Sequence, residues 1–203
     1  MPEIGLFPLP MVLLPTEQVP LHIFEERYKE LIGECIEEDR AFGLLYADAD
    51  GIQEVGTSAS VVEVLTRFDD GRMNVLVEGG ERFRVLELTS GRSFQTGTTL
   101  PLLDDDDPPD SQTTERALEL FEQLRDLTAS EVETPPVDSP QLSYAIAARV
   151  ELDPGIKQGL LQATSERARL ESVCELLVDA AATVERHRRA TERAATNGRV
   201  DLS

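Results

Sequence analysis

The sequence predicts an α+β protein in which a β-rich lobe carrying one helix is followed by a lobe of about four helices. In the first hundred residues, short apolar runs are separated by prolines and by glycine-containing turns, which is typical of strands. Beyond residue 113, apolar residues recur at three- and four-residue spacing, which is typical of amphipathic helices. Between the two lies DDDDPPD at 104–110, a segment too acidic and too rich in proline to enter a core.

The first elements are short. Apolar runs at 6–9, 12–14 and 19–24 are cut by prolines and predict short strands with tight corners. The segment EERYKELIGECIEED predicts one amphipathic helix over 25–38. Its apolar positions are Tyr28, Leu31, Ile32, Cys35 and Ile36.

The next elements predict a meander. Residues 41–47 are mostly apolar and suit a strand buried on both faces. The segments SVVEVLTRF, MNVLVE and ERFRVLEL follow, separated by Asp69-Asp70-Gly71 and by Gly79-Gly80. Because Asp-Gly and Gly-Gly supply the positive φ values of tight hairpins, three antiparallel strands are expected. A further strand is expected over 94–103.

Four segments follow from this pattern. A β-rich lobe spans 1–103, an acidic linker 104–112, a helical lobe 113–194 and a frayed tail 195–203. Within the helical lobe, helices are expected over 114–127, 140–151 and 154–163, and from about 165 onward.

Composition narrows the functional classes. The chain has 203 residues, 40% of them hydrophobic, and a formal charge of -20. Such a charge repels phosphate backbones and anionic lipids, so neither nucleic-acid nor membrane binding is expected. The sequence has no apolar run of roughly eighteen residues, and its N-terminus lacks a basic region. A cytoplasmic protein is therefore expected.

Residues with catalytic or metal-binding chemistry are few. Cys35 and Cys174 are far apart in apolar helical patterns and predict buried free thiols. His22 lies in an apolar strand and suggests a structural role, whereas His187 lies near a helix end, where a solvated face is expected. No catalytic residue, metal ligand or cofactor site is predicted.

Three blocks, in order, resemble a known family. The first contains PLHIFEERY, the second is VGTSASVVEVLTRFDDGRMNVLVEGGERFRVLEL, and the third is KQGLLQATSERARLESVCELL. Together they resemble the amino-terminal domain of Lon proteases over roughly residues 5–180. The matching positions in the first block are Pro20, Leu21, His22, Ile23, Phe24, Glu25, Arg27 and Tyr28.

The resemblance implies a PUA-like antiparallel β-barrel lobe followed by a helical bundle. It also implies a role in recognising unfolded substrates and in organising a hexamer. The chain has no GxxxxGK[ST] loop, and neither Lys29 nor Lys157 lies in the context of a Ser-Lys dyad. We therefore expect a non-catalytic, stand-alone module rather than an enzyme.

The expected partners are unfolded or extended polypeptides, with a protease or chaperone as the machine that receives them. A homo-oligomer is left open. The alternative is a PUA-like module that binds a small ligand or RNA, which the charge of -20 opposes.

The predicted binding residues fall in two groups. The first forms an apolar, proline-containing edge to which an extended peptide could add as a strand. It comprises Leu9, Pro10, Met11, Val12 and Leu14. The second, Phe24 and Tyr28, lies where a strand turns into a helix and is also explained by packing of that helix. The cluster Arg186, Arg188 and Arg189 could dock the acidic face of a partner or of a second copy, although a solvated helix face explains it better.

Overall fold

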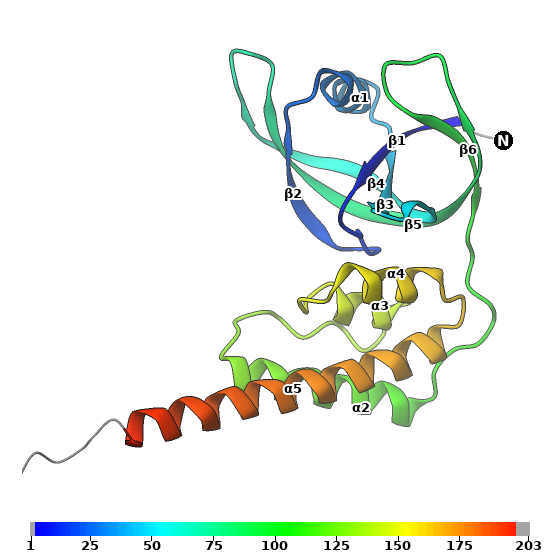
Figure 1. Cartoon of the computed structure of the whole chain (residues 1–203). Coiled ribbons are helices and arrows are strands. Elements are labelled where there is room, and N and C mark those ends of the chain that lie inside the picture. The colour runs from blue at the N-terminus through cyan, green and yellow to red at the C-terminus, as the bar shows by residue number, and fades with distance from the viewer. Residues whose placement is uncertain (1–2, 198–203) are drawn as a thin grey trace, which may run out of the picture. The chain divides into compact units, whose positions relative to one another are not determined.

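The computed structural model describes residues 3–197, and the side chains of 3–191 (Figure 1). The chain forms two compact units. The first comprises the chain up to Asp106 together with Ala147–Thr164, and the second comprises Asp107–Ile146 and the residues from Ser165 onward. Within the described residues, no helix is long and apolar enough to cross a membrane.

The first unit contains six strands and two helices. The strands are β1 (Glu3–Leu9), β2 (Gln18–Ile23), β3 (Phe42–Asp48), β4 (Gly51–Arg67), β5 (Met73–Thr89) and β6 (Thr96–Pro101). The helices are α1 (Glu26–Glu37) and α4 (Pro154–Gln162). The prediction of a helix over 25–38 is therefore confirmed to within a residue at each end.

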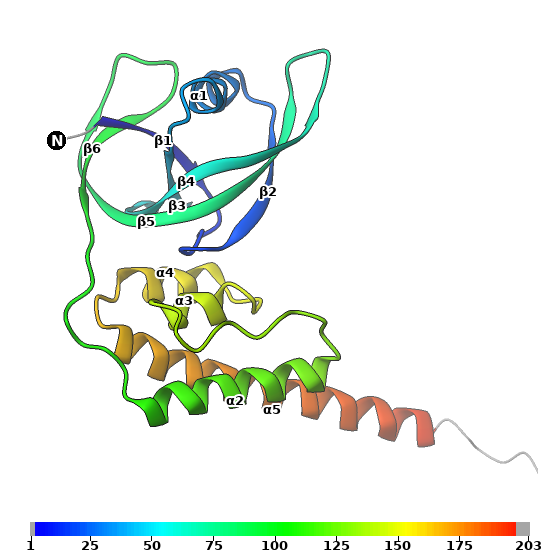
Figure 2. The same cartoon turned by 180° about the vertical axis from the view of Figure 1, so that it is seen from behind.

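The strand pairings return to their starting point. β1 pairs in parallel with β3 and antiparallel with β6, β3 pairs with β4, β4 with β5, and β5 with β6. β2 pairs only with the first half of β5. The long β5 therefore crosses from β2 at one side of the sheet to β6 at the other (Figure 2).

Two predicted strand features are wrong. Residues 12–14 form no strand, and the expected hairpin at Gly79-Gly80 does not exist, because β5 runs through both glycines. Gly79 instead lets the backbone of β5 lie close to the backbone at Leu14, since a Cβ at residue 79 would lie 2.1 Å from the Leu14 carbonyl oxygen. The other predicted turn is confirmed, with Gly71 at a φ of 81° between β4 and β5.

The main core lies between α1 and one face of the curved sheet (Figure 1). Tyr28, Leu31, Ile32 and Cys35 form the buried face of α1. The Tyr28 ring stacks on Phe7 of β1, with 3.9 Å between ring centroids. The helical spacing of apolar residues that predicted α1 thus also determines which face of the helix packs on the sheet.

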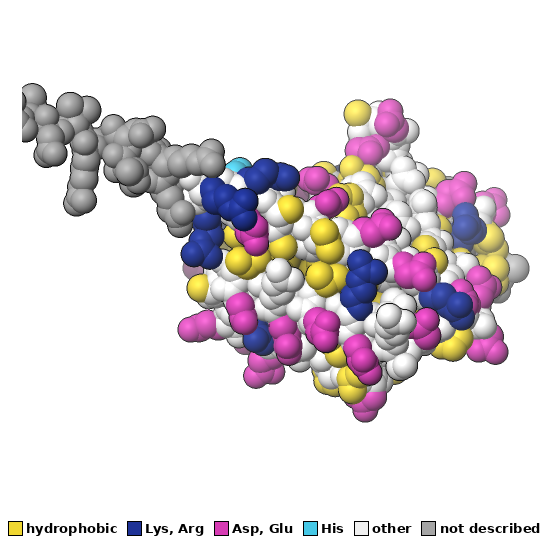
Figure 3. Space-filling model, turned by 90° about the horizontal axis from the view of Figure 1, so that it is seen from below, with side chains coloured by type: hydrophobic (Ala, Val, Ile, Leu, Met, Phe, Trp, Pro, Cys, Tyr) yellow, Lys and Arg dark blue, Asp and Glu magenta, His cyan; other side chains and the backbone are white. Residues whose placement is uncertain are grey.

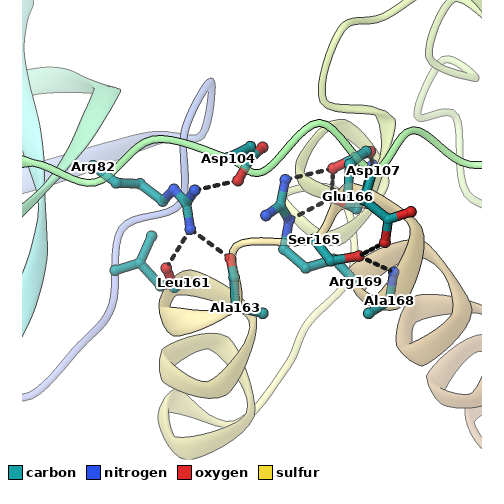
Figure 4. Close-up of polar contacts among 10 residues, drawn as sticks. Arg82, Asp104, Asp107, Leu161, Ala163, Ser165, Glu166, Ala168 and Arg169 are labelled. Atoms are coloured by element: carbon teal, nitrogen blue, oxygen red, sulfur yellow. Dashed lines mark hydrogen bonds and ion pairs between the residues drawn. The ribbon is translucent and has the colours of Figure 1, made fainter.

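The helix α4 belongs to the first unit, although the sequence places 154–163 among the helices of the other lobe. Lys157 pairs with Glu17, which precedes β2. Arg82 of β5 donates Nη1 hydrogen bonds to the carbonyl oxygens of Leu161 (2.8 Å) and Ala163 (2.6 Å) at the end of α4 (Figure 4). These bonds satisfy carbonyls that a helix C-terminus leaves without partners.

The second unit contains α2 (Ser111–Thr128), all but the last residue of α3 (Leu142–Ala147), and α5 (Glu166–Asn197). Phe121 and Leu124 of α2 and Val173 and Leu177 of α5 are buried, as expected for two helices that pack along apolar stripes. α5 extends to Asn197, past the expected start of a frayed tail at 195, and residues 198–203 lie outside the described residues.

A buried polar cluster joins α3 to α5 within the second unit. The Glu166 carboxylate accepts hydrogen bonds from the Ser143 backbone N–H (2.9 Å) and from Arg169 Nη2 (2.6 Å). The Arg169 guanidinium is fully buried and lies 4.4 Å from the centroid of the Tyr144 ring.

The acidic segment is ordered by specific partners, which corrects the expectation that it cannot pack. Asp104 pairs with Arg82, and the Asp105 carboxylate accepts a hydrogen bond from Thr164 at 2.7 Å. Asp110 caps α2 by accepting the Thr113 N–H at 2.7 Å, which holds the pKa of this carboxyl below its usual range. The domain boundaries expected from sequence stay a prediction, but 104–110 is not a loose linker.

Candidate functional site

The first predicted binding segment is largely inaccessible. Val12 and Leu14 are buried, and Leu9 pairs with Tyr46 in the parallel β1–β3 ladder. β1 has strands on both sides, so the segment does not offer the open edge that was expected. Pro10 is exposed and Met11 is half-buried. A binding role for this segment stays a prediction, but the strand edge behind it is wrong.

The two residues of the second predicted group, Phe24 and Tyr28, differ in exposure. Tyr28 is buried against Phe7, so its ring serves the packing of α1, and burial raises its pKa. Phe24 is 59% exposed at the junction of β2 and α1. Of the two rings, only Phe24 is available to a partner.

Phe24 belongs to a small cluster of rings, which we call the aromatic patch: His22, Phe24 and Phe68. The His22 ring lies 5.8 Å from Phe24 and 6.2 Å from Phe68, measured between centroids. Phe68 comes from the tip of the β4–β5 hairpin and is 38% exposed. The fold thus brings together rings that are more than forty residues apart in sequence.

Hydrogen bonds hold the two sides of the patch in place. His22 Nδ1 lies 2.6 Å from Asn74 Oδ1 on the neighbouring β5. Lys29 of α1 donates to the carbonyl oxygen of Asp70 at 3.0 Å, which ties the hairpin tip to the helix. The Asp70 carboxylate accepts the Arg72 backbone N–H, and this bond lowers the pKa of that carboxyl. The hairpin tip is therefore fixed before any partner binds.

Two aliphatic residues of β4 are also exposed on the hairpin. Val62 and Leu65 are each the extra residue where the β4–β5 register shifts, and both side chains are about half exposed. Bulges re-aim side chains and are often retained near functional sites.

Two arginines around the patch are paired, whereas the exposed Arg67, directly before Phe68, has no ion pair among the described side chains. Arg27 contacts Glu25 at 2.8 Å, and Arg72 contacts Asp70 at 2.7 Å while lying 5.2 Å from the Phe68 ring centroid. These pairs leave little net positive charge. The patch thus offers apolar ring surface with polar edges, which suits apolar side chains better than phosphates.

Cys35 is the buried thiol of this unit and borders a cleft of about 350 Å³. Burial raises its pKa to about 11, so the thiol is protonated at neutral pH and is a poor nucleophile. Among the described side chains, no group of three or more His, Cys, Asp or Glu residues could hold a metal ion.

Sequence reasoning missed Phe68 and the position of His22 between Phe24 and Phe68. The signal for Phe68 was its place directly before Asp69-Asp70-Gly71, because an aromatic residue at a hairpin tip has little core to enter. No local signal placed His22 beside it.

Acidic side chains are spread over the face seen in Figure 3, with hydrophobic ones between them.

Comparisons with known proteins give a consistent result. The profile of the family described as "ATP-dependent protease La (LON) substrate-binding domain" matches residues 3–179. Lon protease 1 of Hydrogenovibrio crunogenus (strain DSM 25203 / XCL-2) is 24% identical over 184 residues, covering 82% of this chain and 22% of the relative. The chain thus spans about a fifth of that relative's length.

Two solved structures have a similar fold. The Lon N-terminal domain protein from Xanthomonas campestris superposes with a TM-score of 0.69 and 24% identity, covering 85% of this chain and 97% of that one. The N-terminal domain of Mycobacterium avium complex Lon protease has a TM-score of 0.65 and 16% identity, covering 89% of this chain and 98% of that one.

Proposed function

Since the chain belongs to the family of ATP-dependent protease La (LON) substrate-binding domains, we propose that it is a non-catalytic module that binds unfolded segments of other polypeptides. The observation that carries this proposal is the aromatic patch, where exposed rings from β2 and from the β4–β5 hairpin gather on one surface. Single exposed apolar side chains are ordinary, whereas a held group of them marks an interaction surface.

The energy available at the patch suits weak, sequence-tolerant binding. A Phe side chain carries about 150–250 Å² of surface, so the 59% exposure of Phe24 leaves about 100 Å² to cover. At about 25 cal/mol per Å², full cover of this ring contributes at most about 2.5 kcal/mol. Unfolded chains supply the matching apolar side chains without a defined shape.

The same surface gives little support to the alternatives. Arg27 and Arg72 are paired with carboxylates, and the chain carries a charge of -20, so an RNA backbone meets net repulsion. The proposed chemistry is binding alone, because the patch consists of two phenyl rings and one imidazole rather than a nucleophile beside a base.

Two finer features belong to the same proposal. We expect the ring of strand pairings to be a PUA-like barrel, which is the lobe that the family resemblance implies. We also expect the module to act as an adaptor in protein quality control, passing clients to a protease or chaperone. Cytoplasmic residence stays a prediction, and a homo-oligomer stays open.

The test compares one client protein in two forms. A fluorescently labelled client that has been reduced and alkylated, and is therefore unfolded, should bind, whereas the same client in its native form should not. Replacing Phe24 and Phe68 together by Ser should weaken binding of the unfolded form about tenfold, since each ring supplies roughly half of 1.4 kcal/mol. Fluorescence anisotropy measures both affinities.

A matched control is Val178→Ser on α5, which removes an aliphatic side chain of similar exposure from the other unit. It should leave the affinity unchanged. Equal affinity of the double variant and the unaltered chain for the unfolded client would show that the patch is not the binding surface.

A further inference from the structure

The strands β4 and β5 separate at one end of their ladder. Their last pair is Val55 with Arg84. Before it along β4, Ile52 pairs with Ala47 of β3. Beyond it along β5, residues 85–89 pair with β6 alone, so among the described residues this stretch has a strand on one side only. We call this opening the β4–β5 fork.

A cleft occupies the fork. Its volume is about 370 Å³. Its lining residues are Ile52, Gln53, Glu54, Val55, Arg84 and Gln162. All of them belong to the first unit, in which Gln162 is the last residue of α4. The cleft is thus bounded by the two diverging strands and by the end of a helix that is held on the sheet.

An unused hydrogen-bond acceptor lies beside the cleft. Gln158, one helical turn before Gln162, is 6% exposed and donates its Nε2 to the carbonyl oxygen of Val55 at 3.0 Å. This bond leaves Oε1 of the same amide buried, with no hydrogen-bond partner among the described residues. A buried amide oxygen without a donor is unfavourable.

The open edge itself is apolar. Leu86 and Leu88 are 46% and 49% exposed, and Leu86 is the extra residue where the β5–β6 register shifts. Exposed edges are commonly protected from strand addition by lysine or proline. Residues 85–89 read VLELT and contain neither. The stretch does contain two other protective features, Glu87 and the bulge at Leu86, but its backbone on this side faces no strand among the described residues.

The charge around the fork selects the incoming strand. Glu54 lines the cleft, Glu87 is exposed on the open stretch, Asp48 ends β3, and Asp50 lies in the turn between β3 and β4. Against these four carboxylates stands the Arg84 guanidinium, which lies 3.2 Å from Glu54. Four negative charges and one positive charge leave a local net charge of about -3.

We propose that the β4–β5 fork binds an extended polypeptide segment as an added strand on residues 85–89, and that it prefers segments alternating apolar residues with Lys or Arg. Main-chain hydrogen bonds to the open edge hold such a strand, while its apolar side chains cover Leu86 and Leu88. Its cations meet the carboxylates at the fork. This inference rests on the proposed function, because it assigns a class of segment to a polypeptide-binding module.

The probe is a short fluorescein-labelled peptide of alternating valine and lysine. Anisotropy should show that it binds at least about tenfold more tightly than the peptide of alternating valine and glutamate. Methylating alternate backbone nitrogens of the valine–lysine peptide should also weaken binding about tenfold, because each methyl group removes a main-chain donor. Equal affinity for all three peptides would overturn strand addition.

Charge variants provide the matched comparison. Replacing Glu54 and Glu87 by Gln should weaken binding of the valine–lysine peptide about fivefold. Replacing the exposed Glu119 of α2 and Glu175 of α5 by Gln removes the same charge from the other unit and should change nothing. Equal losses in the two double variants would mean that net charge, rather than the fork, attracts the peptide.

Amide hydrogen exchange followed by NMR separates this inference from the proposed function. The peptide should slow exchange of those amides in 85–89 that face the open edge. If unfolded client binds through the aromatic patch but these amides keep their exchange rates with the peptide, strand addition is wrong and the proposed function stands. If the amides become protected but replacing Phe24 and Phe68 leaves client binding intact, the fork stands and the patch proposal fails.

Discussion

Replacing Arg82 by Met should selectively loosen the sheet and α4 of the first unit. The Arg82 side chain is 2% exposed, and its guanidinium holds the carbonyl oxygens of Leu161 and Ala163 and the carboxylate of Asp104. Methionine keeps most of the apolar stem but donates no hydrogen bond. The substitution therefore isolates the polar contacts from the packing.

The expected loss follows from the groups left behind. Each of the two carbonyls loses its donor in a buried or part-buried position, which costs about 1–2 kcal/mol apiece. Asp104 loses its cation, but with a side chain 20% exposed it regains some water, so about 1 kcal/mol is expected there. The sum is about 3–5 kcal/mol of the free energy of unfolding, within the range for breaking a buried ion pair.

The control is Arg84→Met, two residues along the same strand. Arg84 and Glu54 have side chains 45% and 74% exposed, so their pair is worth roughly 0.5 kcal/mol. Hydrogen exchange with mass spectrometry should show faster exchange in β5, β6 and α4 for Arg82→Met and little change for Arg84→Met. Equal effects of the two substitutions would refute the reasoning, because exposure would then not matter.

Three further predictions test other parts of the chain. Glu166→Ala removes a carboxylate that pairs with the fully buried Arg169 and accepts the Ser143 backbone N–H. The substitution should lower stability by about 3–5 kcal/mol, measured by urea denaturation, and a loss below about 1 kcal/mol would contradict a dry cluster. Gly79→Ala should unfold or shift the sheet, because its Cβ would lie 2.1 Å from a carbonyl oxygen. The control Gly33→Ala in α1 places a Cβ with nothing within 4 Å and should stabilise the chain by about 0.5–1 kcal/mol. Thermal melts measure both effects. Folding raises the pKa of Cys35 from 9.0 to about 11, so the thiol ionises first in the unfolded state and the free energy of unfolding should fall as pH rises from 9 toward 11. Cys35→Ala should remove that part of the decline. An unchanged decline in the variant would be evidence against the raised pKa.

Local signals predicted the elements that local physics controls. The helix α1 follows from apolar residues at helical spacing, and the turn at Gly71 follows from an Asp-Gly step that tolerates positive φ. The same rule failed at Gly79-Gly80, where a missing Cβ serves the approach of a distant backbone carbonyl. A glycine by itself does not reveal which of its two uses applies.

The aromatic patch was only partly predictable. Phe24 stood out because it lies at a junction between a strand and a helix. Tyr28 belongs to the same motif but is buried, since its helix position faces Phe7. Phe68 joins Phe24 only because the long β4–β5 hairpin folds back beside β2, a pairing between distant segments that no local pattern contains.

The amino-acid sequence by itself determined the family, the mixed α+β class, the amphipathic helices and the strong negative charge, because periodicity, motif order and composition are local or additive properties. Tertiary structure alone decided that α4 joins the sheet, that the aspartates at 104–110 have partners, and that β1 is enclosed while the β4–β5 fork stays open. The physical reason is that burial and strand pairing depend on which distant segments meet. An α+β member of this family is therefore predictable from its sequence, whereas its open edge and its exposed rings are properties of the fold.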